Sequence, residues 1–435
     1  MGRLVSRQAG AMTSLVLATT LGVQVFARAA HPEIALVLSI AVTELLLVTW
    51  LAVPRTERIR AWPLWTGLSL AYGLLAKGPI AGVVPLIGVV CAAPFVIDLR
   101  SRWREAARDA ALAGVVALAL AAPWYVAMTA THGAEFLRVA VWAQNVGRYA
   151  GQMADHGQSA GVFALAVAVG LLPWVGLLPA AVARTRRPDG DQRKAVRFVL
   201  VVIAITSLAF YSASASKLAS YSLALIPPLA ALIGIYLDEV IEKSRTGAFK
   251  WAATTLVAVA LAFAAVPLLG GTTFRMRDLI GGVPAAQGLG TIWWLVTPVI
   301  VVLIAGALTL VALPLRAKIT ALAVTGVAAP LAILLAAAPI LDDAYPWQRF
   351  GAQIRHAPGP VWIQTYRAPS LTFFAGQPVT IVNDDEMREL LAGAGSGWVV
   401  VGADWRDKPE LAARLAAATA EIVDRSPRLI LVTLR

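Results

Sequence analysis

The chain has 435 residues, of which 59% are hydrophobic and 14% charged, with a formal net charge of +12. Apolar runs of about 20 residues, each long enough to cross about 30 Å of hydrocarbon, recur along it. This composition excludes an ordinary soluble globular protein and predicts a polytopic α-helical membrane protein. The basic residues lie mostly in loops, which favours the membrane and excludes nucleic acid as a partner. The single cysteine, Cys91, excludes a disulfide within the chain.

The apolar runs predict about eleven transmembrane helices. They cover residues 9–27, 34–53, 62–76, 79–97, 109–130, 160–183, 196–213, 218–237, 251–269, 291–313 and 318–340. The first run could also belong to a signal peptide, but further spans follow it at once, which favours a span.

Positive charge alternates between successive loops. About twenty cations fall in one set of loops and about seven in the other, which predicts that the first set is cytoplasmic. The N-terminus is then inside and the C-terminus outside, in the bacterial inner membrane. One long outer segment, Thr131–Ser159, has apolar residues spaced as in an amphipathic helix that lies along the membrane surface.

The composition changes near residue 341, and the sequence predicts a membrane domain over 1–340 and a small extracytoplasmic α/β domain over 341–435. We expect strands at 361–366, 379–382, 398–401 and 429–434, helices at 387–392 and 409–422, and a mostly parallel sheet. No glycine-rich phosphate loop opens either helix, so a nucleotide site in this domain is not expected.

Three cations lie on the outer side, which is otherwise poor in positive charge: Lys77, Arg148 and Lys217. Singly, Lys77 could mark the interface by snorkelling, and Arg148 could lie on a solvated helix face. Together they suggest a cradle for an anion such as a lipid phosphate. Lys217 and Tyr221 are four residues apart, so on one helix their side chains would share a face and could donate to the same phosphate oxygen.

Acidic residues are scarcer on this side. Glu33 opens the second span, where a carboxylate stabilises a helix N-terminus. It could instead activate an acceptor, orient it or hold a divalent metal. His31, His132 and His156 match no metal-binding spacing, so no metal ligands are assigned and no cofactor is required by the sequence.

Five motifs, in this order along the chain, resemble those of a known family. They are Ala-Lys-Gly-Pro at 76–79, Pro-Trp-Tyr at 123–125, Asn-Val-Gly-Arg at 145–148, Leu-Pro-Trp at 172–174 and Ser-Lys-Leu-Ala-Ser-Tyr at 216–221. The chain thereby resembles the bacterial lipid A aminoarabinose transferases and the wider protein-O-mannosyltransferase-like glycosyltransferases of the GT-C type. The resemblance implies transfer of a sugar from a polyprenyl phosphate to a lipid, glycan or protein acceptor at the outer face of the membrane.

Carried over by position, the resemblance implies that Lys77, Arg148 and Tyr221 bind the lipid phosphate, with Lys217 beside them. Asn145 and Trp174 lie in these motifs and Tyr149 directly follows one of them, and all three are expected to support the site. Glu33 falls where the family has an acidic residue, so it is the candidate catalytic carboxylate.

The sequence departs from the family at its start. Members begin with two further spans and a large outer loop that carries the principal catalytic aspartate, and the first apolar run here matches their third. The chain is therefore expected to be a shortened transferase or an inactive polyprenyl-phosphate-binding protein. A transporter is a third alternative, which would require inverted repeats and charges near the bilayer centre. No repeat stands out, and apart from the residues at their ends the spans are nearly free of charge.

Overall fold

The computed structural model describes the whole chain except residues 29–31, 60, 148, 152–158, 245, 270–287, 358, 365–368, 394–395, 403–408, 418 and 435. It divides into two compact units. The first unit comprises Met1–Ala260 and Val301–Pro330, and the second comprises Leu261–Ile300 and Leu331–Arg435.

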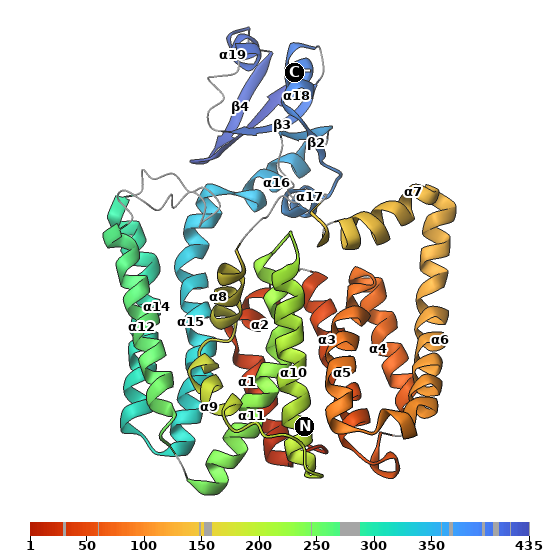
Figure 1. Ribbon diagram of the computed structural model, residues 1–435. Coiled ribbons are helices and arrows are strands. Elements are labelled where there is room, and N and C mark those ends of the chain that lie inside the picture. Colours follow the sequence, from red (N-terminus) through yellow and green to blue (C-terminus); the bar gives the residue numbers. More distant parts are fainter. Residues whose placement is uncertain are drawn as a thin grey trace. The chain divides into compact units, whose positions relative to one another are not determined.

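Helices occupy every one of the eleven predicted ranges (Figure 1). They are α1 (Arg7–Thr19), α2 (Leu21–Phe26), α3 (Pro32–Ala52), η1 (Arg55–Glu57), α4 (Trp62–Lys77), α5 (Ile80–Val96), α6 (Leu99–His132), α8 (Ala160–Gly170), η3 (Trp174–Leu177), α9 (Leu178–Val182), α10 (Gln192–Ala213), η4 (Ala219–Leu225), α11 (Ile226–Lys243), α12 (Phe249–Leu269), α14 (Gly288–Ala312) and α15 (Leu315–Ala344). Among the described residues, six helices are long and apolar enough to cross a membrane, or seven if a bent pair counts as one span. The prediction of a multi-pass helical protein is confirmed, whereas the count of eleven stays a prediction for the shorter helices.

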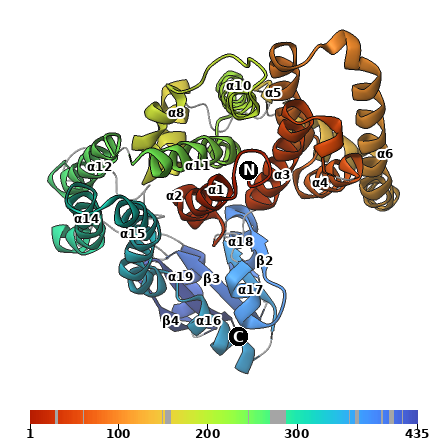
Figure 2. The same cartoon turned by 90° about the horizontal axis from the view of Figure 1, so that it is seen from below.

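Small residues let the helices of the first unit approach closely, as is common where helices pack without a hydrophobic driving force. Figures 1 and 2 show α1 lying along α11 and α3 along α4. A Cβ added at Gly234 of α11 would lie 2.6 Å from the backbone nitrogen of Thr13 in α1. A Cβ at Gly67 of α4 would lie 2.7 Å from the carbonyl oxygen of Ala113 in α6. Glycine at these positions therefore sets the backbone separation between α11 and α1 and between α4 and α6.

Two predicted spans are broken. Helix α8 and the η3–α9 segment meet at an angle of 99°. The predicted span 218–237 begins with extended backbone at Leu218, continues as the 3₁₀ helix η4 and becomes α-helical only at Ile226. The expectation that Lys217 and Tyr221 share one α-helical face is therefore wrong, because Lys217 precedes the helix and η4 has a different residue spacing.

The segment between α6 and α8 contains α7 (Ala134–Leu137) and the π-helix η2 (Arg138–Gly147). The apolar side chains of Leu137, Val139, Trp142 and Val146 are exposed, as expected for a helix whose surroundings include the membrane interface. Arg138 hydrogen-bonds Glu135 through Nε and Oε2 at 2.6 Å, and this bond holds the pKa of the Glu135 carboxyl below its usual range.

The second unit contains a five-stranded sheet in the order β2-β1-β3-β5-β4. Its elements are α16 (Trp347–His356), β1 (Val361–Gln364), α17 (Pro369–Ala375), β2 (Thr380–Val382), α18 (Asp384–Ala392), β3 (Gly397–Gly402), α19 (Pro409–Ala416), β4 (Ala420–Arg425) and β5 (Leu429–Leu434). One core cluster joins α16 and α17 to one face of the sheet, and another joins α18 and α19 to the opposite face. The predicted α/β tail is thus confirmed.

Two details of that tail were predicted wrongly. The sheet is mixed, because β1 pairs parallel with β2 and β3 whereas β5 pairs antiparallel with β3 and β4. The predicted helix 409–422 ends at Ala416, and residues 420–425 form the edge strand β4. Burial alternates along β4, which is the period of a strand with one face on the core.

Candidate functional site

Small polar side chains join helices α3 and α4 and fix how the two helices are aligned along their length. Ser39 of α3 donates to the carbonyl of Ser69 at 2.7 Å, and Ser69 returns a bond to the carbonyl of Ser39 at 3.0 Å. Thr43 donates to the Ser69 hydroxyl at 3.0 Å. Hydrogen bonds between helices are favoured where no water competes. They bring the N-terminus of α3 beside the C-terminus of α4.

The predicted acid and the first predicted cation meet at that junction. Lys77 lies in the last turn of α4 and Glu33 in the first turn of α3, where the helix dipoles favour each charge. The Lys77 ammonium donates to Oε1 of Glu33, and the Ser220 hydroxyl donates to the same oxygen at 3.2 Å. The Glu33 side chain is 5% exposed and that of Lys77 is 25% exposed. Glu33 is therefore the buried partner, and Lys77 is the part of the pair that a ligand can reach.

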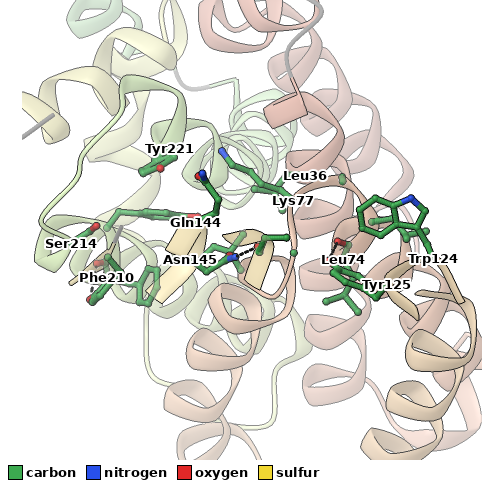
Figure 3. Close-up of a pocket in the computed structure, with 17 residues that line it drawn as sticks. Leu36, Leu74, Lys77, Trp124, Tyr125, Gln144, Asn145, Phe210, Ser214 and Tyr221 are labelled. Carbon is green, nitrogen blue, oxygen red and sulfur yellow. Dashed lines mark hydrogen bonds between the residues drawn. The ribbon is translucent and has the colours of Figure 1, made fainter. Parts of the chain in front are cut away.

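The Lys77 ammonium also lies 4.9 Å from the centre of the Tyr221 ring, a cation–π contact. Both side chains line a cavity of about 280 Å³ (Figure 3). In that view Lys77, Gln144 and Tyr221 gather on one side of the cavity, and Trp124 and Tyr125 lie on the other. A cationic group in a largely apolar hollow suits an anion carried on an apolar molecule.

Aromatic rings form one wall of the cavity. Tyr221 contacts Tyr211 at 5.4 Å between ring centres, Tyr211 contacts Phe210 at 5.3 Å, and Phe210 contacts Tyr149 at 4.9 Å. The Tyr149 hydroxyl donates to the Phe210 carbonyl at 3.3 Å. Four rings from α10, η4 and the segment after η2 thus support one another and fix the position of Tyr221 against Lys77.

Asn145 lines the cavity from the π-helix η2. Its amide nitrogen donates to the carbonyls of Ala140 and Val141 at 3.1 and 3.0 Å, within its own helix. Gly78, with φ of +87°, ends α4 directly beneath it, and an added Cβ there would lie 3.3 Å from the Asn145 amide nitrogen. The glycine therefore provides both the left-handed turn after Lys77 and the room for Asn145.

The remaining predicted residues lie elsewhere or outside the description. Lys217 donates to the Ser214 carbonyl at 2.7 Å in the loop before η4, and it does not line the cavity. Trp174 is fully buried, and its indole N–H donates to Thr19 at 3.0 Å, away from the cavity lining. Arg148 lies outside the described residues. Its role and that of Lys217 stay predictions.

Within the described residues no three His, Cys, Asp or Glu side chains come close enough together to hold one metal ion. His31 and His156 fall outside the described part of the chain. The pairing of Glu33 with a lysine and a serine is that of a carboxylate held by hydrogen bonds.

One acidic residue was missed. Glu44 lies in the middle of α3, is 2% exposed, and neither of its carboxylate oxygens has a hydrogen-bond partner in the described structure. It interacts electrostatically with Tyr211 of the cavity wall. This residue is an exception to the expectation that the spans are nearly free of charge away from their ends. The sequence signal was visible, because an ionisable residue within an apolar span is itself unusual.

Known proteins resemble this chain in sequence and in fold. Residues 3–134 match the family model for dolichyl-phosphate-mannose-protein mannosyltransferase. Two curated relatives are undecaprenyl phosphate-alpha-4-amino-4-deoxy-L-arabinose arabinosyl transferases. The one from Pseudomonas aeruginosa strain LESB58 is 34% identical over 193 residues, which is 44% of this chain and 33% of the relative. The one from Sodalis glossinidius is 34% identical over 221 residues, 50% of this chain and 38% of the relative.

The predicted family resemblance is confirmed. The matching stretch spans only about a third of the length of these relatives. Over nearly the whole chain the fold is that of ArnT from Cupriavidus metallidurans. The crystal structure bound to undecaprenyl phosphate superimposes with a TM-score of 0.74 at 20% identity, covering 98% of this chain and 79% of that one. The apo structure also has a TM-score of 0.74, at 19% identity. The expected fold, a multi-pass helical part with a small C-terminal α/β domain, is therefore confirmed.

Proposed function

We propose that this protein is a membrane glycosyltransferase that takes a sugar from a polyprenyl phosphate and passes it to a lipid, glycan or protein acceptor. The observation that carries the proposal is the cavity in which Lys77 and Tyr221 meet beneath η2. The curated relatives are named as arabinosyl transferases of an undecaprenyl-phosphate donor, and the solved relative binds undecaprenyl phosphate. The proposal extends the donor chemistry of those proteins to this chain.

In the proposed reaction the phosphate of the donor lies against the Lys77 ammonium and the Tyr221 hydroxyl. The acceptor oxygen forms a bond to the anomeric carbon while the bond from that carbon to the phosphate oxygen breaks. Lys77 stabilises the charge that develops on the leaving phosphate, with Arg148 as the second predicted cation. The proton of the acceptor passes to a carboxylate.

Glu33 has two parts in this scheme. It is held behind Lys77, where it orients the ammonium toward the cavity. A phosphate that binds Lys77 competes with Glu33 for the same N–H donors. The carboxylate is then released from part of its pairing and can accept the acceptor's proton or orient the acceptor. The role proposed for Glu33 is thus the one expected from the sequence, that of the catalytic carboxylate.

We further propose that the cavity opens to the outer face of the bacterial inner membrane, that the N-terminus is cytoplasmic, and that residues 341–435 form a periplasmic domain after a membrane domain of 1–340. The segregation of charge along α10 and α11 supports this orientation. Arg193 and Arg197 lie near the start of α10, whereas Tyr211 near its end and Tyr221 before α11 line the cavity. Arginine-rich ends are typical of the cytoplasmic side.

The binding half of the proposal is tested with a fluorescent undecaprenyl-phosphate analogue and the purified protein in nanodiscs. Lys77→Ala combined with Arg148→Ala should weaken binding at least tenfold, because two charge-assisted contacts are lost. Arg138→Ala is the matched control, since Arg138 is an exposed cation of η2 that does not line the cavity. Undiminished binding by the double variant would refute the phosphate site.

The transfer half is tested separately with a radiolabelled donor sugar and the intact membrane protein. Wild-type protein should transfer the sugar, and Glu33→Gln should lose transfer while it still binds the analogue. Binding without transfer in the wild-type protein would favour the alternative of an inactive polyprenyl-phosphate-binding protein. Normal turnover by Glu33→Gln would remove Glu33 from the catalytic site.

A further inference from the structure

A second hollow lies in the first unit at the opposite end of α11 from the Lys77 cavity. It is lined by Ala180, Arg184, Tyr236, Lys250 and Trp251, with the backbone turn of residues 246–248. Tyr236 and the start of α12 lie near the C-terminus of α11, whereas Tyr221 precedes its N-terminus. The two hollows therefore share no lining residue, and the proposed transfer reaction does not use this one.

The hollow depends on a close approach between η3–α9 and α12. Gly176 lies one turn before Ala180, and a Cβ added at Gly176 would lie 2.6 Å from the Cα atom of Ala252. Without a side chain at this position, the two backbones meet, and the loop that follows α9 is brought beside the first turn of α12. Two basic segments that are far apart in the sequence thus come together at one place.

Arg184 is held rigidly at the wall of the hollow. Its Nη1 donates to Oε2 of Glu239 at 2.9 Å, and its guanidinium carbon lies 4.7 Å from the centre of the Tyr236 ring. Glu239 is itself bound by Arg197 at 2.8 Å. Its one carboxylate is also 3.9 Å from Arg193, and the charged side chains that line the hollow itself are Arg184 and Lys250, both cations. The unused N–H groups of Arg184 form a planar donor set suited to a phosphate.

Lys250 supplies a second cation to the hollow. Among the described residues its ammonium makes no hydrogen bond or ion pair, and it lies 5.7 Å from the centre of the Trp251 ring. The Trp251 side chain is 60% exposed. A tryptophan and a tyrosine beside two cations are the side chains that proteins place at the level of lipid headgroups.

The adjoining face of α12 is suited to acyl chains. Trp251 and Val257 are exposed, whereas Ala252, Leu256 and Ala260 are buried against the protein. The charge pattern of the loops assigns this end to the cytoplasmic side, where the leaflet is rich in anionic lipids. We propose that the hollow binds the phosphodiester headgroup of an anionic phospholipid between Arg184 and Lys250, with the acyl chains along the exposed face of α12.

The test is native mass spectrometry of the full-length protein released from micelles that contain equal amounts of phosphatidylglycerol and phosphatidylcholine. Wild-type protein should retain phosphatidylglycerol preferentially. Lys250→Ala should lower that retention about fivefold, the effect of one basic contact at a lipid surface. Lys194→Ala is the matched control, because Lys194 is an exposed cation paired with Asp189 near the start of α10 and does not line the hollow.

Equal retention by Lys250→Ala and wild-type protein would overturn the proposal, as would an equal loss in Lys194→Ala or equal retention of both lipids. Inorganic phosphate and glycerol 3-phosphate distinguish a lipid from a free phosphate, and neither should displace the retained phosphatidylglycerol at millimolar concentration. Displacement would assign the hollow to a soluble phosphate compound instead. Lys250→Ala should keep its thermal stability and its binding of the undecaprenyl-phosphate analogue, which separates this site from the Lys77 cavity.

Discussion

Replacing Glu33 by glutamine removes the charge that holds the Lys77 ammonium in place. The Glu33 side chain is 5% exposed and accepts hydrogen bonds from Lys77 and Ser220. The substitution therefore removes the charge of a desolvated carboxylate that accepts two hydrogen bonds. A hydrogen bond to a charged group contributes roughly 1.5–3 kcal/mol. Lys77 keeps its contact with Tyr221 and is 25% exposed, so hydration recovers part of the loss. We therefore expect Glu33→Gln to lower the free energy of unfolding by about 2 kcal/mol.

The same pairing predicts that changes at Lys77 and Glu33 have non-additive effects on the free energy of unfolding. Lys77→Met and Glu33→Gln, measured alone and together by chemical unfolding in mixed micelles, should show a coupling energy of about 1–2 kcal/mol. The exposed pair of Glu135 and Arg138 is the matched control, since both side chains are more than half exposed and solvent screens their attraction. That pair should show no measurable coupling. Additive effects of the Glu33 and Lys77 changes would mean that the ion pair does not organise the site.

Three further changes test other parts of the structure. Glu44→Met should raise the midpoint of thermal unfolding, because it removes a buried carboxylate without hydrogen-bond partners, and a lower midpoint would show that the carboxylate is stabilised. Glu239→Gln should destabilise the protein by about 3 kcal/mol, since Arg197 is left buried without its counter-charge, whereas Glu242→Gln at a half-exposed position should have little effect in the same unfolding assay. Gly234→Ala should cost about 2 kcal/mol because the added methyl group meets the backbone of α1, and an unchanged unfolding midpoint would mean that α1 can move away.

The sequence was sufficient for the parts of the fold that depend on long apolar runs. Every predicted range contains a helix, because an apolar stretch of span length satisfies its backbone only as a helix in lipid. It was insufficient where local geometry departs from the α-helix. Nothing in the composition of residues 216–225 distinguishes a 3₁₀ start from an α-helical one, so the predicted shared face of Lys217 and Tyr221 was wrong. The strand β4 was missed because the alanine-rich stretch before it obscured its alternation.

For the site, the resemblance implied that Lys77 and Tyr221 act together on a lipid phosphate, which stays a prediction; both side chains line one cavity, but the sequence could not pair them. The ion pair of Lys77 with Glu33 depends on the register of α3 against α4, which is set by the buried bonds of Ser39 and Ser69. The contact of Lys77 with Tyr221 also needs η4 beside α3, where Ser220 donates to Glu33. Short polar residues within apolar runs carry little weight in a hydropathy pattern, so this register could be read only from the structure.

The most direct measurement is an experimental structure of the full-length protein with undecaprenyl phosphate bound. The proposed function predicts density for the phosphate within about 3 Å of the Lys77 ammonium, with the Tyr221 hydroxyl beside it and the first isoprene units in the cavity beneath η2. Glu33 should have lost part of its contact with Lys77. A phosphate bound elsewhere, with the cavity empty and the pair of Glu33 and Lys77 intact, would contradict the assignment of this cavity to the sugar donor.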